Sequence, residues 1–170
     1  FMDTQRWRIR PQADLSNPIF QGQGCTIEDS SWHGTGVSGI IAANSDNGQW
    51  LAGIDWAAKI LPVRVLGKCG GDDSDIMDGI AWAAGLNVPG VPPNPYPAQV
   101  INISLGGPGE CTPLYHSVLS SALSHGITRA IVVAAGNETA DVSTSPGRCT
   151  VMVLDPTAPG RSAYTARHCS

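Results

Sequence analysis

The chain has few charged residues and no long apolar run. Asp, Glu, Lys and Arg make up 14% of its 170 residues, and its formal net charge is −4. Because there is no basic run either, the electrostatic footprint of a nucleic-acid-binding protein is missing. No apolar stretch reaches the roughly 18 residues of a membrane-spanning helix. We therefore expect no nucleic acid and no membrane among its partners.

Closely spaced cysteine pairs are also missing, although the chain contains 5 cysteines. Zinc and redox motifs need such pairs, so disulfides are the favoured interpretation, with reduced cysteines as the alternative. Pairing Cys25 with Cys69 and Cys111 with Cys149 would close loops of about 40 residues, each stabilising by roughly 4 kcal/mol. Cys169 has no partner in this scheme. The pattern predicts an oxidising, extracellular compartment.

The chain is rich in small and turn-forming residues, with 20 glycines and 13 prolines. Its length predicts one domain, complete or partial, over residues 1–170. Residues 1–32 show no periodicity, and the proline-rich stretch 88–97 predicts an exposed loop. Hydrophobic spacing and capping residues predict three helices and three strands. The helices are expected at 33–43, 75–84 and 112–125, and the strands at 59–66, 98–105 and 127–135.

This alternation of helices with apolar strands predicts an α/β fold, a mostly parallel sheet with helices on both faces. Ligands bind beyond the carboxyl ends of the strands in such sheets. The three strand ends here are rich in glycine: 66–71, 104–107 and 134–137. Glycines let an extended peptide approach the main chain closely, although each alone is also an ordinary turn residue.

His33 opens a glycine-punctuated helix, His-Gly-Thr-Gly-Val-Ser-Gly. A histidine at a helix start projects its ring beyond the helix, which suits a catalytic base, although a packing role is the alternative. Asn137 directly follows a strand and a glycine, where its amide could donate a hydrogen bond to an oxyanion. Taken alone it would be a turn residue. His116, His125 and His168 fit no such arrangement and are expected on the surface.

Three blocks in this order resemble the subtilisin-like serine proteases. They are His-Gly-Thr at 33–35, Val-Ile-Asn-Ile-Ser-Leu-Gly-Gly at 100–107 and Val-Val-Ala-Ala-Gly-Asn at 132–137. The likeness runs from about Ser31 to Asn137, and it is greatest to secreted bacterial members that carry disulfides and a Cys-Gly-Gly turn. The resemblance implies a secreted endopeptidase that hydrolyses peptide bonds by acyl transfer.

The resemblance also implies a role for each matching residue. His33 would be the general base, and Asn137 would donate its amide to the tetrahedral oxyanion. The residues expected to flank the substrate main chain are Gly70, Gly71, Ser104, Leu105 and Gly106. Those expected to wall the specificity pocket are Ala134, Ala135 and Gly136.

The catalytic aspartate should lie upstream of His33, and Asp3 in Asp3-Thr4 is the candidate. In its favour, residues 10–15 are similar to the segment after that aspartate in the family. Against it, Gln5 replaces the family's glycine and residues 5–8 look inserted. Asp14, Asp29 and Glu28 are the alternatives.

The chain departs from the family at two further places. Gly36 stands where a second histidine is usual. The family's nucleophile lies in a Gly-Thr-Ser-Met block, and this block does not occur in the 170 residues. Ser170 is no substitute, because it stands at the terminus beside Cys169. The chain thus resembles a subtilisin-like domain truncated at its C-terminal side.

The loop Asn44–Gly48 offers oxygen ligands, and in many relatives the corresponding loop holds calcium. It contains one acidic side chain, so an ordinary polar turn is the alternative. The metal site is thus unknown: a structural calcium is compatible with the resemblance, and the chemistry itself needs no cofactor. We expect a polypeptide substrate and a monomer.

The sequence leaves three hypotheses. The first is a secreted serine endopeptidase whose nucleophile is absent from this chain. The second is a noncatalytic peptide-binding relic of the same fold. The third attributes residues 5–10 and 165–170 to errors in the sequence of an ordinary active enzyme.

Overall fold

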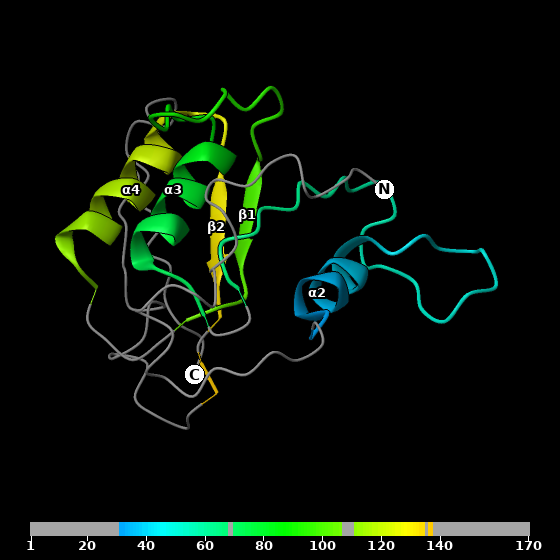
Figure 1. The fold of residues 1–170 in the computed structure, drawn as a ribbon. Helices are drawn as coiled ribbons and strands as arrows, with labels where there is room; N and C mark the ends of the chain where they lie inside the picture. The colour runs from blue at the N-terminus through cyan, green and yellow to red at the C-terminus, as the bar shows by residue number, and fades with distance from the viewer. Residues whose placement is uncertain (1–30, 68–69, 107–110, 135, 138–170) are drawn as a thin grey trace, which may run out of the picture. The chain divides into compact units, whose positions relative to one another are not determined.

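The computed structural model describes residues 31–67, 70–106, 111–134 and 136–137. The elements follow in the order α2 (His33–Ala42), α3 (Asp73–Ala83), β1 (Val100–Ile103), α4 (Pro113–Ser124) and β2 (Ala130–Val133), as Figure 1 shows. The chain divides into two compact units, Phe1–Ile76 and Met77–Ser170, with the boundary inside α3.

The first unit is built around α2 and the segment that returns to its C-terminal end. The last carbonyls of a helix have no partner within the helix. Here they accept hydrogen bonds from a returning backbone, Gly53 to Ala43, Ile54 to Ile40 and Asp55 to Ile41, at 2.9–3.1 Å. Gly53 is buried, and a Cβ at this position would collide with the backbone of Ala42 and Ala43. A glycine is therefore required where the chain crosses the helix end.

The strand expected at 59–66 is absent from the described part of the first unit, and this prediction was wrong. Its neighbour Gly67 forms only an isolated antiparallel bridge with Gly70. Pro62 has no N–H to donate to a sheet. The Arg64 guanidinium Nε donates to the carbonyl of Leu66 at 3.2 Å. An apolar, β-branched composition is not sufficient for a strand, because a strand also needs a hydrogen-bonded neighbour.

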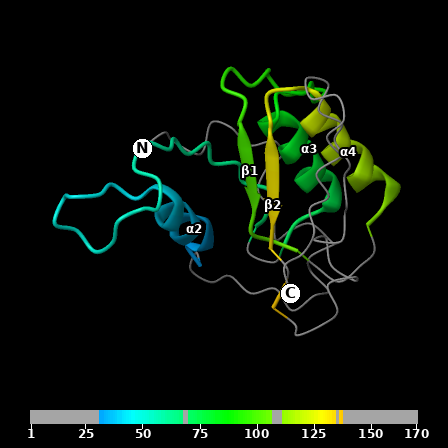
Figure 2. The ribbon, with the colours of Figure 1, turned by 180° about the vertical axis from the view of Figure 1, so that it is seen from behind.

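The second unit contains a parallel strand pair (Figure 2). β1 and β2 pair in register from Val100 with Ala130 to Ile103 with Val133. The backbone N–H of Ala134 extends the pairing by donating to the carbonyl of Ile103 at 2.9 Å. The parallel sheet of the predicted α/β class is confirmed in this pair.

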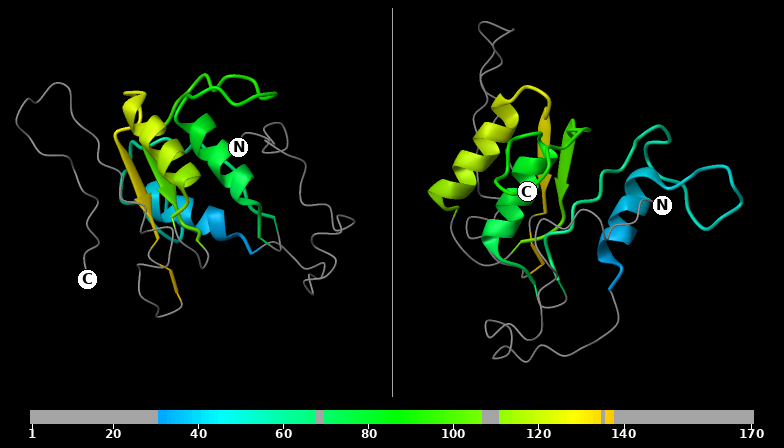
Figure 3. Two further views of the ribbon diagram at one scale, coloured as in Figure 1. Left: turned by 90° about the vertical axis from the view of Figure 1, so that its left-hand side faces the viewer. Right: turned by 45° about the horizontal axis from the view of Figure 1, so that its top comes forward.

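Helices α3 and α4 lie on the same side of this strand pair, as the views in Figure 3 show. α4 contacts β2. Apolar side chains are buried in this unit. Ile76, the last residue of the first unit, is also buried. These buried apolar residues are Ile76, Met77, Ile80, Trp82, Ala83, Ala84, Val88, Ile101, Leu119 and Ala122. This core fixes the strands whose ends carry the predicted site.

Both helices of the second unit carry the expected signals at their ends. Thr112 caps α4 by accepting a hydrogen bond from the Tyr115 N–H at 3.3 Å. Pro113 occupies the first helical position, where its missing N–H costs nothing. α3 ends in a Schellman motif, in which Gly85 (φ 85°) donates to Trp82 and Leu86 donates to Ala81. The helices predicted at 75–84 and 112–125 are thus confirmed, with ends shifted by one or two residues.

Both strands of the second unit are shorter than predicted. Ala98 lies outside β1 because its N–H donates to the carbonyl of Ala83 at 2.8 Å. Its own carbonyl accepts a hydrogen bond from the buried Thr128 hydroxyl at 2.8 Å. Because these bonds engage the residues just before the two strands, the strand pairing starts only at Val100 and Ala130.

Candidate active site

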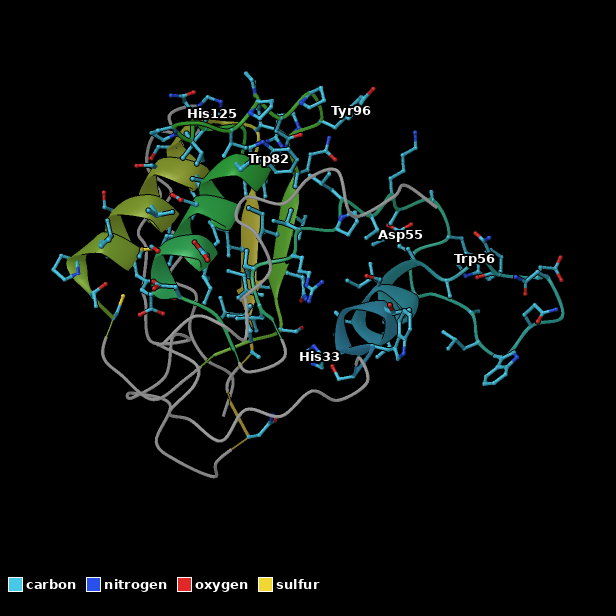
Figure 4. All side chains as sticks on the ribbon, in the orientation of Figure 1. His33, Asp55, Trp56, Trp82, Tyr96 and His125 are labelled. Atoms are coloured by element: carbon cyan, nitrogen blue, oxygen red, sulfur yellow. The ribbon has the colours of Figure 1, made fainter. Side chains whose placement is uncertain are left out.

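His33 is the first residue of α2 and is exposed (Figure 4). The preceding Trp32 adopts the left-handed conformation (φ 53°) and provides no side-chain cap. The His33 backbone N–H donates instead to the Ser31 hydroxyl at 3.4 Å. The sharp turn at Trp32 brings the chain into the helix at His33. The predicted helix 33–43 is confirmed and ends at Ala42.

The glycine turn after residue 66 also belongs to the first unit. Gly67 donates to the carbonyl of Gly70 at 2.7 Å, and Gly70 has a φ of 101°. Such a positive φ favours glycine. A Cβ at Gly71 would collide with the carbonyl oxygen of Val65. Gly70 and Gly71 are therefore required by the turn, whatever their part in binding a peptide.

The other two glycine-rich strand ends lie at one edge of the strand pair in the second unit. β1 and β2 are parallel and end in register at Ile103 and Val133. The chain therefore leaves the strand pair at the same edge after both strands, at Ser104 and at Ala134. This edge is where ligands bind in open parallel sheets.

Asn137 is exposed and follows Gly136, whose φ is 101°. The positive φ turns the chain immediately after the strand end, a conformation that residues with a Cβ rarely adopt. The second unit thus contains both the candidate oxyanion donor, three residues after Ala134, and the segment after β1 that is expected to flank the substrate.

Sequence reasoning missed Asn102, which positions part of this edge. Its side-chain Nδ2 donates to the hydroxyl of Ser104 at 2.8 Å, two residues further along the chain. The two side chains share one face because strand side chains alternate with a period of two. The sequence signal for Asn102 was a polar residue in an otherwise apolar strand, two positions before the segment expected to flank the substrate.

Several predicted residues fall outside the described ranges. They are Asp3, Ala135, Cys25, Cys69 and Cys149, together with Asp14, Glu28, Asp29 and His168. The roles of Asp3 and Ala135 and the disulfide pairing therefore stay predictions. His116 and His125 are exposed, as expected.

The loop at Asn44–Gly48 makes local hydrogen bonds. The Asn47 Oδ1 accepts a hydrogen bond from the Gln49 N–H at 2.9 Å, and the Ser45 hydroxyl donates to the Ala43 carbonyl at 3.3 Å. Among the residues that the structure describes, no three His, Cys, Asp or Glu side chains gather as a metal would require. The side chains here thus fit an Asx-type turn, and calcium binding stays a prediction.

No helix within the described ranges combines the length and the apolar character that crossing a membrane requires.

Comparisons with known proteins agree with the sequence motifs. Residues 11–162 match the Subtilase family. The extracellular protease of Xanthomonas campestris pv. campestris is 48% identical over 145 residues, which cover 84% of this chain and 25% of that protein. The extracellular basic protease of Dichelobacter nodosus is 49% identical over 132 residues, covering 76% and 22%. This chain thus spans about a quarter of the length of these relatives.

A solved structure from work on proteases of Pseudoalteromonas arctica has the same fold. It superposes with a TM-score of 0.68 at 50% identity, covering 72% of this chain and 36% of the other. The likeness is high in both sequence and backbone, and the family match extends over most of the chain. The chain therefore belongs to the subtilase family.

Proposed function

We propose that the protein carrying this chain is a secreted serine endopeptidase that hydrolyses peptide bonds by acyl transfer. The observation that carries the proposal is the shared edge of β1 and β2, where the two strands end in register at Ile103 and Val133. An extended polypeptide binds to such an edge through main-chain hydrogen bonds. The family membership adds the chemistry.

In the proposed reaction, His33 removes the proton from a serine hydroxyl as the serine attacks the carbonyl carbon of the substrate. It then returns the proton to the leaving amine. Asn137 donates its amide to the oxyanion that forms on the former carbonyl oxygen. Asp3 would orient the imidazole. The serine is not supplied within these 170 residues by the family's Gly-Thr-Ser-Met block.

Substrate binding is assigned to the glycine-rich segments. Gly70, Gly71 and Ser104–Gly106 would flank the substrate main chain, and residues 134–136 would form the wall of the side-chain pocket. Asn102 donates a hydrogen bond to the Ser104 hydroxyl and so acts as a positioning residue for the segment 104–106.

Secretion and disulfides are part of the same proposal. Two relatives are named as extracellular proteases, which supports secretion. We propose that Cys111 pairs with Cys149 and Cys25 with Cys69, and the bonded state of Cys111 supports the first of these two bonds. We further propose a monomer and no cofactor in the chemistry, with the loop Asn44–Gly48 as either a polar turn or a site for a structural calcium.

The second candidate function is a noncatalytic peptide-binding relic, which the same strand edge would serve. Such a protein would keep the strand edge and bind extended peptides without cleaving them. Its peptide binding would not change when the His33 imidazole is removed.

The two functions are separated by peptide hydrolysis with the intact protein and its His33→Ala variant. General acid–base catalysis contributes roughly 10²–10⁴-fold to the rate, so we expect kcat of His33→Ala to fall by roughly 10²-fold or more. His116→Ala is the matched control, since His116 is an exposed histidine on α4. Equal hydrolysis by wild type and His33→Ala would contradict the role of His33, and peptide binding without any hydrolysis would favour the relic.

A further inference from the structure

The connection between α3 and β1 is a proline-rich segment with many exposed residues, including Tyr96 at 72% exposure. We call residues 88–97, Val-Pro-Gly-Val-Pro-Pro-Asn-Pro-Tyr-Pro, the proline loop. It contains Pro89, Pro92, Pro93, Pro95 and Pro97. A long exposed connection is the usual site of proteolytic nicking. The mechanism proposed above uses no residue of this loop.

The proline loop is fixed to the C-terminal end of α3. The side chain of Asn94 is buried, and its Nδ2 donates to the carbonyls of Trp82 at 3.0 Å and Ala83 at 3.3 Å. The indole N–H of Trp82 donates in turn to the carbonyl of Pro92 at 2.8 Å. Figure 4 shows Trp82 and Tyr96 near this end of α3. These bonds hold the loop against the end of α3, where the Trp82 carbonyl also accepts from Gly85 and the Ala83 carbonyl from Ala98.

The order of residues in the loop has a second consequence. The side chains that an endopeptidase with an apolar pocket would select are Val88, Val91 and Tyr96, and a proline directly follows each of them. Asn94 is also followed by proline. Only the Gly90–Val91 bond joins two residues that are not proline.

Proline opposes cleavage for a physical reason. An endopeptidase binds its substrate as an added strand, through main-chain N–H and C=O groups. Proline has no N–H, its ring locks its own φ, and it restricts the residue before it. A loop of ten residues that contains five prolines cannot present a continuous ladder of donors, even when it opens locally.

We propose that the proline loop protects this connection against endopeptidases that bind their substrate as an extended main chain, including the protein's own activity. The prolines make the bonds after the apolar side chains poor substrates, and the Asn94 and Trp82 hydrogen bonds keep the loop from opening. Protection against the protein's own activity rests on the proposed function. Protection against another endopeptidase does not.

The test is limited proteolysis of the folded, intact protein with chymotrypsin, which cleaves after aromatic residues, followed by mass mapping of the fragments. Pro97→Ala turns Tyr96–Pro97 into a cleavable bond. We expect cleavage after Tyr96 to accelerate by roughly tenfold or more, because local opening now exposes a usable site. Pro95→Ala is the matched control, since it removes a proline from the same loop but places the new bond after Asn94. We expect it to match wild type.

Cleavage of Pro97→Ala after Tyr96 no faster than in wild type would overturn the proposal, as would rapid cleavage of wild type within residues 88–97. If Pro97→Ala fails to fold, Pro92→Ala with an elastase-type protease asks the same question at Val91, and it keeps the carbonyl that Trp82 bonds. Autolysis is then followed in the active protein. If Pro97→Ala gives a new fragment ending at Tyr96 with chymotrypsin but not during autolysis, protection against the protein's own activity is overturned. Protection against other endopeptidases is then still supported.

Discussion

At the scale of single residues, the positions of Asn137 and His33 are set by turns rather than by packing. Gly136 turns the chain after the strand end, and Trp32 turns it into α2. Both Asn137 and His33 are exposed, so substitution should leave the fold intact. Effects on catalysis can then be separated from effects on stability.

Replacing Asn137 by Ala should lower kcat by roughly 10²–10³-fold with little change in KM, because the amide acts on the oxyanion of the transition state. This magnitude is the one known for subtilisin itself and is carried over from it. Steady-state kinetics on a peptide substrate measure both parameters. A rise in KM of the same factor, with kcat unchanged, would instead show that Asn137 binds the substrate in its ground state.

The positions of single residues could be predicted from the sequence where a motif marks a chain turn. His33 at its helix start and Asn137 after its strand are two such cases. Asn94 and Asn102 could not be found in this way, because their partners are fixed by tertiary contacts. Nothing in a proline-rich stretch reveals that Asn94 folds back onto the carbonyls of Trp82 and Ala83.

At the scale of elements, Gly85 closes α3 in a conformation that requires glycine. A Cβ at Gly85 would lie 2.8 Å from the ring Cγ of Pro97, in addition to the strain of a φ of 85°. Gly85→Ala should lower the free energy of unfolding by more than the roughly 1–2 kcal/mol of a left-handed alanine. Gly126→Ala is the matched control, because Gly126 has a φ of 89° and open space around it. Urea denaturation compares the two, and equal losses would rule out the contact with Pro97.

Helix α2 contains three glycines, of which Gly36 replaces the family's usual histidine. A Cβ at Gly36 meets nothing within 4 Å, and its backbone is helical. Gly36→Ala should therefore raise the free energy of unfolding by roughly 0.5–1 kcal/mol, because alanine loses less conformational freedom in a helix. Thermal unfolding followed by circular dichroism measures this effect. A lower midpoint would show that another part of the protein packs against this position.

The helices could be predicted more closely than the strands. Thr112-Pro113 and Gly85 are local signals, and a helix forms its hydrogen bonds within itself. A strand depends on its neighbour, which the sequence does not show. For this reason the strand predicted at 127–135 covers only Ala130–Val133, and the strand predicted at 59–66 is absent among the described residues.

At the scale of the whole molecule, disulfides are expected to supply a large share of the stability. Each of the two proposed bonds closes a loop of about 40 residues and stabilises by roughly 4 kcal/mol through the unfolded chain. Reduction should therefore lower the unfolding midpoint in urea. Cys111→Ser should lower it in the oxidised protein and have a smaller effect once reductant is present. Equal effects under both conditions would mean that Cys111 contributes by packing.

The central claim is that His33 is the base of a serine peptidase. It is tested most directly by labelling the intact protein with a serine-directed phosphonate and measuring its mass. We predict one adduct on the wild-type protein and none on His33→Ala, because the imidazole activates the attacking serine. The 170-residue chain alone should also remain unlabelled, since it lacks the Gly-Thr-Ser-Met block. An unlabelled wild-type protein, or equal labelling of wild type and His33→Ala, would contradict the account.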